Sequence, residues 1–249
     1  MSDVVNNDLA GKRLLVVGAS VSIGEAIAST ALARGATVTV AARRKDNLDQ
    51  IVASAPDRAT AIQTDCMIAD DCVRLIDGAV AAMGGLDWLV YTPALFLLRD
   101  LEELTADEWH QVLGLNLVGA ALVTSAALPH LGEARGKAVY FSSESAHPEP
   151  HWPGLASYAV SKVALEKMIK CWRVERTDIN FSIIEAGPTD GSDGPVGGGW
   201  TEEQFNKFLP RWQGMRPHIQ PRSAIVDSVL HVLTSPSYIE HVTVGPPRL

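Results

Sequence analysis

The sequence predicts an α/β protein built on one doubly wound parallel sheet with helices on both faces. Strand-like apolar runs alternate with helix-like segments along the chain, the order in which crossover helices connect parallel strands. The strand-like runs are apolar at consecutive positions, which predicts burial of both sheet faces. With 249 residues, 47% of them hydrophobic, the chain suits one such domain, and we expect it over residues 1–249.

The individual elements follow from local patterns. The first strand is expected within 12–19, and helix 23–34 ends before Gly35, a residue typical of helix ends. Residues 37–42 are rich in β-branched side chains and predict the second strand. The alternation continues with strands at 59–63, 86–91, 137–142, 179–184 and 241–244 and helices at 46–54, 70–83, 106–131, 156–173, 201–209 and 222–234. The Gly/Pro-rich stretch 187–199 lies inside this pattern and predicts a loop.

Charge and composition argue against several classes of partner. The net charge is −8, and the longest basic run is Arg43-Arg44-Lys45, so nucleic acid and anionic membrane surfaces are not expected to bind. No apolar run reaches the ~18 residues of a membrane span. Residues 1–9 are polar and give no secretory signal.

The cysteine and histidine patterns predict neither a disulfide framework nor a metal site. Cys66, Cys72 and Cys171 are odd in number and match no zinc spacing, so a reduced, cytoplasmic location is expected. The histidines at 147, 151 and 218 suggest a metal only weakly, and we expect none.

The turn after the first strand, Gly18-Ala-Ser-Val-Ser22-Ile-Gly24, predicts a Rossmann-type dinucleotide site. Gly18 would form the tight turn, Gly24 would allow close strand–helix packing, and the helix N-terminus would bind a pyrophosphate. Ser22 stands where such a loop usually has glycine, but serine is small and its hydroxyl can donate a hydrogen bond. The alternative is an ordinary strand–turn–helix.

The end of the second strand, Ala41-Ala42-Arg43-Arg44, bears on the choice of cofactor. NAD sites usually place an acidic residue here to bind the ribose 2′-hydroxyl. This chain has Ala42 followed by Arg43, whose planar guanidinium suits a 2′-phosphate. The pattern favours NADP(H), with a solvated basic turn as the alternative.

Tyr158 and Lys162 are spaced to lie on one face of the helix expected at 156–173. A free tyrosine has a pKa of about 10 and is a poor base at neutral pH. A nearby ammonium lowers that pKa, so the pair could act as a tuned general acid/base.

These motifs, in this order, resemble the short, single-domain branch of the short-chain dehydrogenase/reductase family over about residues 10–245. The family's Asn-Leu-x-Gly helix segment is similar to Asn116-Leu-Val-Gly119, and its strand-end serine precedes a Tyr-xxx-Lys motif as Ser143 does here. The resemblance implies an NADP(H)-dependent oxidoreductase that interconverts a carbonyl and an alcohol, with ketone or aldehyde reduction favoured.

The resemblance also implies the residue roles. Tyr158 would exchange a proton with the substrate oxygen. Lys162 would lower the tyrosine pKa and bind the nicotinamide ribose, and Asn116 would hold a water on the proton path. A serine would bind the substrate oxygen: the strand end favours Ser143, whereas the spacing to the tyrosine favours Ser145. Asn116 could instead bridge backbone groups within its helix.

The resemblance also implies the residues of the cofactor site, and the chain departs from the family pattern at several of its positions. Cofactor contacts are expected from Gly18, Ser20, Ser22, Ile23, Arg43, Asp65, Cys66, Thr92, Tyr158, Lys162 and Thr189. Tyr91-Thr92-Pro93-Ala94 replaces Asn-Asn-Ala-Gly, Glu185-Ala186-Gly187 replaces Asn-Pro-Gly, and Gly191 falls where a threonine is common. The alternative function is a cofactor-sensing regulatory protein of the same fold with little turnover.

Residues 188–215 are expected to form a substrate lid. Thr201 to Gln204 forms a capping box, with Trp200 and Phe205 as a staple. The aromatic residues Trp152, Trp200, Phe205, Phe208 and Trp212 would line a substrate pocket, or else pack the lid or a subunit contact. A third possible function is the reduction of acyl chains on a carrier protein. Such carriers are usually acidic, so a local basic patch would be needed, and the arginines at 211, 216 and 222 are its candidates. A homo-oligomer, tetramer or dimer, is expected through the helices near 106–131 and 156–173.

Overall fold

Seven parallel strands form a single sheet in the computed structural model, which describes residues 7–148, 151–190, 200–212 and 219–245. The predicted features at 191, 197–199, 216 and 218 lie outside the described residues. The strands are β1 (Arg13–Val17), β2 (Thr37–Ala42), β3 (Ala59–Gln63), β4 (Trp88–Tyr91), β5 (Lys137–Ser143), β6 (Asn180–Ala186) and β7 (His241–Val244). Their order is β3-β2-β1-β4-β5-β6-β7, which confirms the predicted doubly wound parallel sheet.

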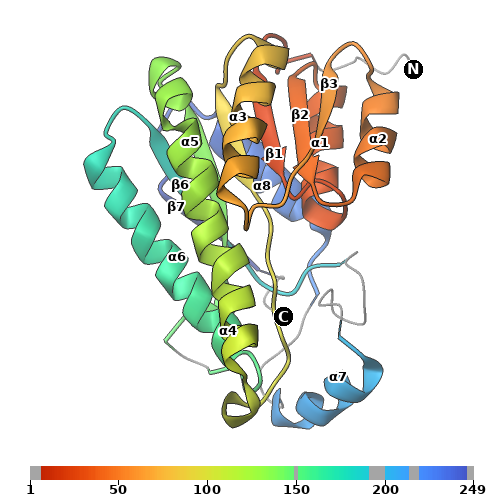
Figure 1. Ribbon diagram of the computed structural model, residues 1–249, viewed down its shortest axis with the longest axis vertical. Coiled ribbons are helices and arrows are strands. Elements are labelled where there is room, and N and C mark those ends of the chain that lie inside the picture. The colour runs from red at the N-terminus through yellow and green to blue at the C-terminus, as the bar shows by residue number, and fades with distance from the viewer. Residues whose placement is uncertain (1–6, 149–150, 191–199, 213–218, 246–249) are drawn as a thin grey trace.

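Helices cover both faces of the sheet (Figure 1). They are α1 (Ser22–Ala33), α2 (Lys45–Ser54), α3 (Ala69–Met83), α4 (Ala106–Leu113), α5 (Ala120–Glu133), α6 (Ala156–Glu175), α7 (Glu202–Phe208) and α8 (Arg222–Thr234). The cores under α1 and α8 and under α3, α5 and α6 are separate clusters on opposite sheet faces. Val16 packs into the first cluster and its neighbour Val17 into the second, both fully buried. Burial of such a side chain stabilises the fold by about 1.5–3 kcal/mol.

The connections run in opposite directions from β1 and β4, which are neighbours in the sheet. Such a switch point leaves a crevice outside the carboxyl ends of the two strands, where α/β proteins bind ligands. β4 starts two residues later than expected, because Asp87 does not continue the strand. Its carboxylate instead accepts hydrogen bonds from the backbone N–H and the guanidinium of Arg13.

The predicted helix over 106–131 contains a π-helical segment, Gly114–Gly119, between α4 and α5. A π-helical turn shifts the pattern of backbone hydrogen bonds and is frequent at functional sites. The hydroxyl of Tyr91 donates to Leu115 O at 2.8 Å. The departure at Tyr91 thus supplies a hydrogen-bond partner to this irregular turn.

The continuous helical stretch Ala106–Glu133 has the length and composition of a membrane-crossing helix, with a mean hydropathy of 1.7 in its most apolar window. In the described fold it packs on the sheet. Val123, Ala127 and Leu131 are fully buried in the core under α3, α5 and α6. A core helix passes the same test of length and composition, so this one helix is weak support for a membrane span.

Helix α7 lies at the end of the molecule where α4 and α6 begin (Figure 1). The predicted capping box is confirmed: Thr201 Oγ1 accepts from Gln204 N at 3.1 Å, and the Gln204 side chain accepts from Thr201 N at 2.9 Å. Phe208 and Trp212 are buried with Leu98 and Leu155 in a third, smaller cluster. The role of residues 188–215 as a lid stays a prediction.

Candidate active site

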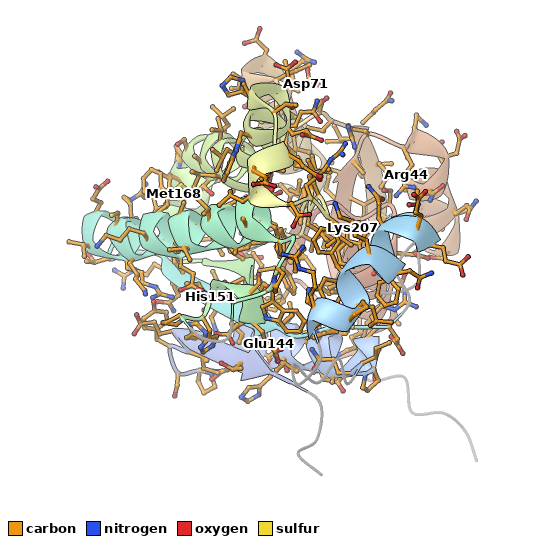
Figure 2. The ribbon with its side chains drawn as sticks, turned by 90° about the horizontal axis from the view of Figure 1, so that it is seen from below. Arg44, Asp71, Glu144, His151, Met168 and Lys207 are labelled. Atoms are coloured by element: carbon orange, nitrogen blue, oxygen red, sulfur yellow. The ribbon has the colours of Figure 1, made fainter. Side chains whose placement is uncertain are left out.

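A cavity of about 870 Å³ lies along the carboxyl ends of the central strands. All the residues expected to contact a cofactor line it: Gly18, Ser20, Ser22, Ile23, Arg43, Asp65, Cys66, Thr92, Tyr158, Lys162 and Thr189. Figure 2 views the molecule from the end where α7 lies, and labels Arg44 and Glu144, two lining residues that are well separated in this view.

The turn between β1 and α1 forms one wall of the cavity. Gly18 has a φ of +85°, and a Cβ there would collide with Thr92 Oγ1. A Cβ on Gly24 would lie 2.5 Å from Gly18 O and 2.8 Å from Thr92 Oγ1. Both positions therefore require glycine, and the Thr92 hydroxyl, which donates to Val17 O at 2.8 Å, packs against them.

The start of α1 fits a pyrophosphate. Its N-cap residue, Val21, provides no side-chain hydrogen bond to the first turn, and no other described side chain caps the N–H groups that would meet an anion. Ser22 has a φ of +55°, which a glycine would adopt freely and which costs another residue about 1–2 kcal/mol. Ser22, which replaces the usual glycine, therefore adopts a backbone conformation typical of glycine and is strained by it.

Arg43 and Arg44 follow β2 and line the far end of the cavity. Arg43 is exposed, and its guanidinium makes no hydrogen bond or ion pair among the described residues. The backbone carbonyl oxygen of Arg43 accepts a hydrogen bond from Gln63 Nε2 at 2.9 Å. An oriented backbone with an available guanidinium fits a ribose 2′-phosphate better than a 2′-hydroxyl.

Tyr158 and Lys162 lie on α6 and face the cavity. The Lys162 Nζ atom is 5.4 Å from the centre of the Tyr158 ring and donates to Phe141 O at 2.8 Å. Burial lowers the pKa of Lys162 from 10.5 to about 8. Burial also raises the pKa of Tyr158 to about 12. The side chain of Ser143 has the opposite, smaller effect on this pKa. Lys162 is not among the causes that lower the pKa of Tyr158, and the loss of solvent around the phenol outweighs the effect of Ser143.

Both candidate serines line the cavity next to Tyr158. Ser143 ends β5, and Ser145 follows in a single 3₁₀ turn. Ser145 donates to Ser143 Oγ from its backbone N–H at 3.2 Å and from its hydroxyl at 3.1 Å. Of the two serines, Ser143 is the one whose hydroxyl lowers the pKa of Tyr158. The choice of Ser143 over Ser145 stays a prediction, which this arrangement favours.

Asn116 is fully buried behind the cavity wall and does not line it. Its amide bridges the Leu95 backbone, with Leu95 N to Oδ1 at 2.7 Å and Nδ2 to Leu95 O at 2.8 Å, and also donates to Ser161 Oγ at 2.9 Å. It therefore ties the π-helical segment to the loop after β4 and to α6, instead of bridging groups within its own helix. Its role in holding a water stays a prediction.

Aromatic side chains form the wall beyond Tyr158. The rings of Phe96 and Tyr158 are 5.1 Å apart between centres, and Phe96 meets Trp200 edge-on at 5.1 Å. Trp212 contacts Trp152 at 5.7 Å and Phe205 at 6.0 Å. These residues line the cavity, as expected of a substrate pocket. Phe208, in contrast, does not line the cavity and is buried with Leu98, Leu155 and Trp212.

The sequence reasoning missed several lining residues, of which Glu144, Leu95 and Phe96 are the most informative. A charged residue directly after the apolar strand 137–143 was the available signal for Glu144. The basic patch considered for an acyl carrier stays a prediction, because position 216 lies outside the described residues. Arg211 pairs with Asp100, whereas Arg222 donates to Ser22 O at 3.3 Å.

Comparison with known proteins places this chain in a family. The sequence profile described as short chain dehydrogenase matches residues 12–194. The chain belongs to the short-chain dehydrogenase family. The expected resemblance is thereby confirmed, and the family is one of oxidoreductases.

Individual family members are moderately similar. The 11-beta-hydroxysteroid dehydrogenase 1A of Arabidopsis thaliana is 32% identical over 197 residues, covering 75% of this chain and 54% of that protein. This chain thus spans about half the length of the curated relatives it matches. A short chain dehydrogenase from Burkholderia cenocepacia, solved in complex with NADP, has a TM-score of 0.80 and 28% identity, with 96% of this chain and 98% of that chain covered. An alcohol dehydrogenase from Thermococcus sibiricus has a TM-score of 0.81 at 22% identity, over 96% and 99% of the two chains, and shares the fold.

Proposed function

We propose that the protein is an NADP(H)-dependent oxidoreductase that reduces a ketone or an aldehyde to an alcohol. The observation that carries the proposal is the meeting of Tyr158, Lys162 and Ser143 in one cavity with the uncapped start of α1 and the available guanidinium of Arg43. The related dehydrogenase from Burkholderia cenocepacia was solved with NADP, which supports this choice of cofactor.

Different residues of the chain would bind different parts of the cofactor. The Gly18–Gly24 turn and the first turn of α1 would hold the pyrophosphate, and Arg43 would bind the 2′-phosphate. Lys162 and Thr189 would contact the nicotinamide end. The bound cofactor would supply the hydride, and the cavity would hold the carbonyl carbon beside it.

Tyr158 is suited to donate the proton that completes the reduction. With a pKa of about 12, its phenol keeps its proton at neutral pH and can hydrogen-bond a carbonyl oxygen as a donor. Ser143, which is bonded to Tyr158 and to Ser145, would offer the same oxygen a second donor. Lys162, with a pKa of about 8, is mostly an ammonium at neutral pH and would stabilise the phenolate left on Tyr158.

Tyr158→Phe tests this proposal. The change removes the proton donor and leaves the ring, so we expect the rate of NADPH-dependent reduction of an aryl ketone to fall roughly a hundredfold to ten-thousandfold. The affinity for NADPH, measured by tryptophan fluorescence, should change only slightly. Wild-type protein that binds NADPH but turns over no carbonyl in a broad panel would contradict the proposal and favour the regulatory alternative. The oligomeric state and the cytoplasmic location stay predictions.

A further inference from the structure

The charged groups of the cavity are distributed unevenly. Arg43 and Arg44 lie at one end, and Lys162 lies beside Tyr158 in the middle. Beyond Tyr158 the wall is aromatic, and Glu144 lines the same cavity one residue after Ser143. A substrate held beside Tyr158 is therefore in a cavity that offers both a carboxylate and aromatic rings.

The Glu144 carboxylate is half-buried and lies across the end of β6. A Cβ added at Gly187 would lie 2.5 Å from Glu144 Oε1 and 3.2 Å from Oε2. The small residue at Gly187 therefore gives this side chain its place beside the cavity. Neither carboxylate oxygen has a hydrogen bond or ion pair to any described residue, so both can meet a ligand.

The nearby histidines are already engaged by a second carboxylate. Glu185 is 4% exposed, and its two oxygens contact His147 Nε2 at 2.7 Å and His241 Nε2 at 3.2 Å. Among the described residues, no side chain forms an ion pair with Glu144. Burial and the charge of Glu185 raise its pKa, and the charge of His147 opposes them. A cation supplied by a ligand would relieve both costs.

The aromatic wall favours the same kind of ligand. Trp200 and Trp212, whose ring centres are 5.9 Å apart, line the cavity together with Phe96. Aromatic faces attract organic cations, and the apolar body of such a ligand gains from contact with the same rings. A carboxylate with several aromatic rings is therefore complementary to an organic ammonium ion.

We propose that Glu144 selects carbonyl substrates that carry a protonated amine on an apolar body, with the carbonyl at Tyr158 and the ammonium at Glu144. The proposal rests on the proposed function for the position of the carbonyl. It makes Glu144 a specificity-determining residue. Anionic substrates, such as keto acids, are disfavoured by the same carboxylate.

A matched pair of ketones tests the proposal. One is γ-(dimethylamino)butyrophenone, and the other is its neutral isostere, in which a CH group replaces the amine nitrogen. For wild-type protein with NADPH at neutral pH, we expect a lower KM for the amine than for the isostere. In Glu144→Gln this preference should fall about tenfold or more, because a hydrogen bond to a charged group is lost. Glu175→Gln removes the same charge from an exposed position near the end of α6 and should keep the preference.

A binding measurement separates this proposal from the proposed function. Titration of tryptophan fluorescence with the amine reports its affinity without turnover. Binding of the amine that weakens in Glu144→Gln supports the proposal even if neither ketone is reduced, in which case only the proposed function fails. Equal KM values and equal affinities for the two ketones in wild-type protein, or an unchanged preference in Glu144→Gln, would overturn it.

Discussion

Lys162 is a buried amine whose charged form destabilises the folded protein. Its pKa is lowered from 10.5 to about 8 by burial, and its Nζ atom donates to Phe141 O. A lowering of this size corresponds to about 3 kcal/mol. Below about pH 8 the folded protein carries this cost in full, because the amine is protonated in both folded and unfolded states. Above about pH 10.5 the amine is neutral in both states, and the cost disappears.

Lys162→Met removes the titrating group and keeps a long, flexible side chain. The free energy of unfolding of the variant, relative to wild type, should be higher at pH 7 than at pH 10 by about 2 kcal/mol or more, since most of the window between the two pKa values lies in this range. The lost hydrogen bond to Phe141 O costs about 1 kcal/mol at both pH values and does not affect that difference.

Urea unfolding at the two pH values measures this difference directly. Lys167→Met is the matched control, because Lys167 is exposed on the same helix, and we expect no comparable dependence on pH. Titration of the other groups affects wild type and variants alike, so it cancels in the comparison. A stability difference between Lys162→Met and wild type that stays constant from pH 7 to pH 10 would refute the claim that Lys162 is desolvated.

Three further substitutions test the walls of the cavity. Ser22→Gly should raise the free energy of unfolding by about 1 kcal/mol, because Ser22 has a φ of +55°; a lower value in urea unfolding would mean that its side chain makes a stabilising contact that outweighs the strain. Ser143→Ala should lower kcat for ketone reduction roughly a hundredfold or more, and Ser145→Ala should lower it less, because Ser145 acts through Ser143. The reverse order in kcat would assign the substrate contact to Ser145.

The order of the strands and helices could be predicted because it depends on local patterns. Continuous apolar runs such as 137–142 indicated burial on both faces, and glycine after a helix marked its end. The cofactor residues were predictable for a related reason. In a parallel sheet, the residues that follow successive strands meet at one edge, so Gly18, Arg43, Asp65 and Thr92 all line the cavity.

Features that depend on contacts between distant segments could not be predicted. The π-helical segment at 114–119 has ordinary helical side-chain periodicity around it, and its partner Tyr91 lies more than twenty residues earlier. The isolation of Glu144 arises because Glu185, on β6, engages histidines from a loop and from β7. The raised pKa of Tyr158 reflects burial by loops whose paths the sequence does not specify.

The central claim is that the cavity binds NADP(H), and a fluorescence titration tests it most directly. The chain has six tryptophans, and NADPH and NADH can each be titrated into wild-type protein and into Arg43→Ala. We expect wild-type protein to bind NADPH more tightly than NADH and Arg43→Ala to lose this preference. The control Arg176→Ala, at the C-terminal end of α6 and remote from Tyr158, should keep it. Binding of neither nucleotide by wild-type protein would contradict the account, and equal binding of both would contradict the role of Arg43.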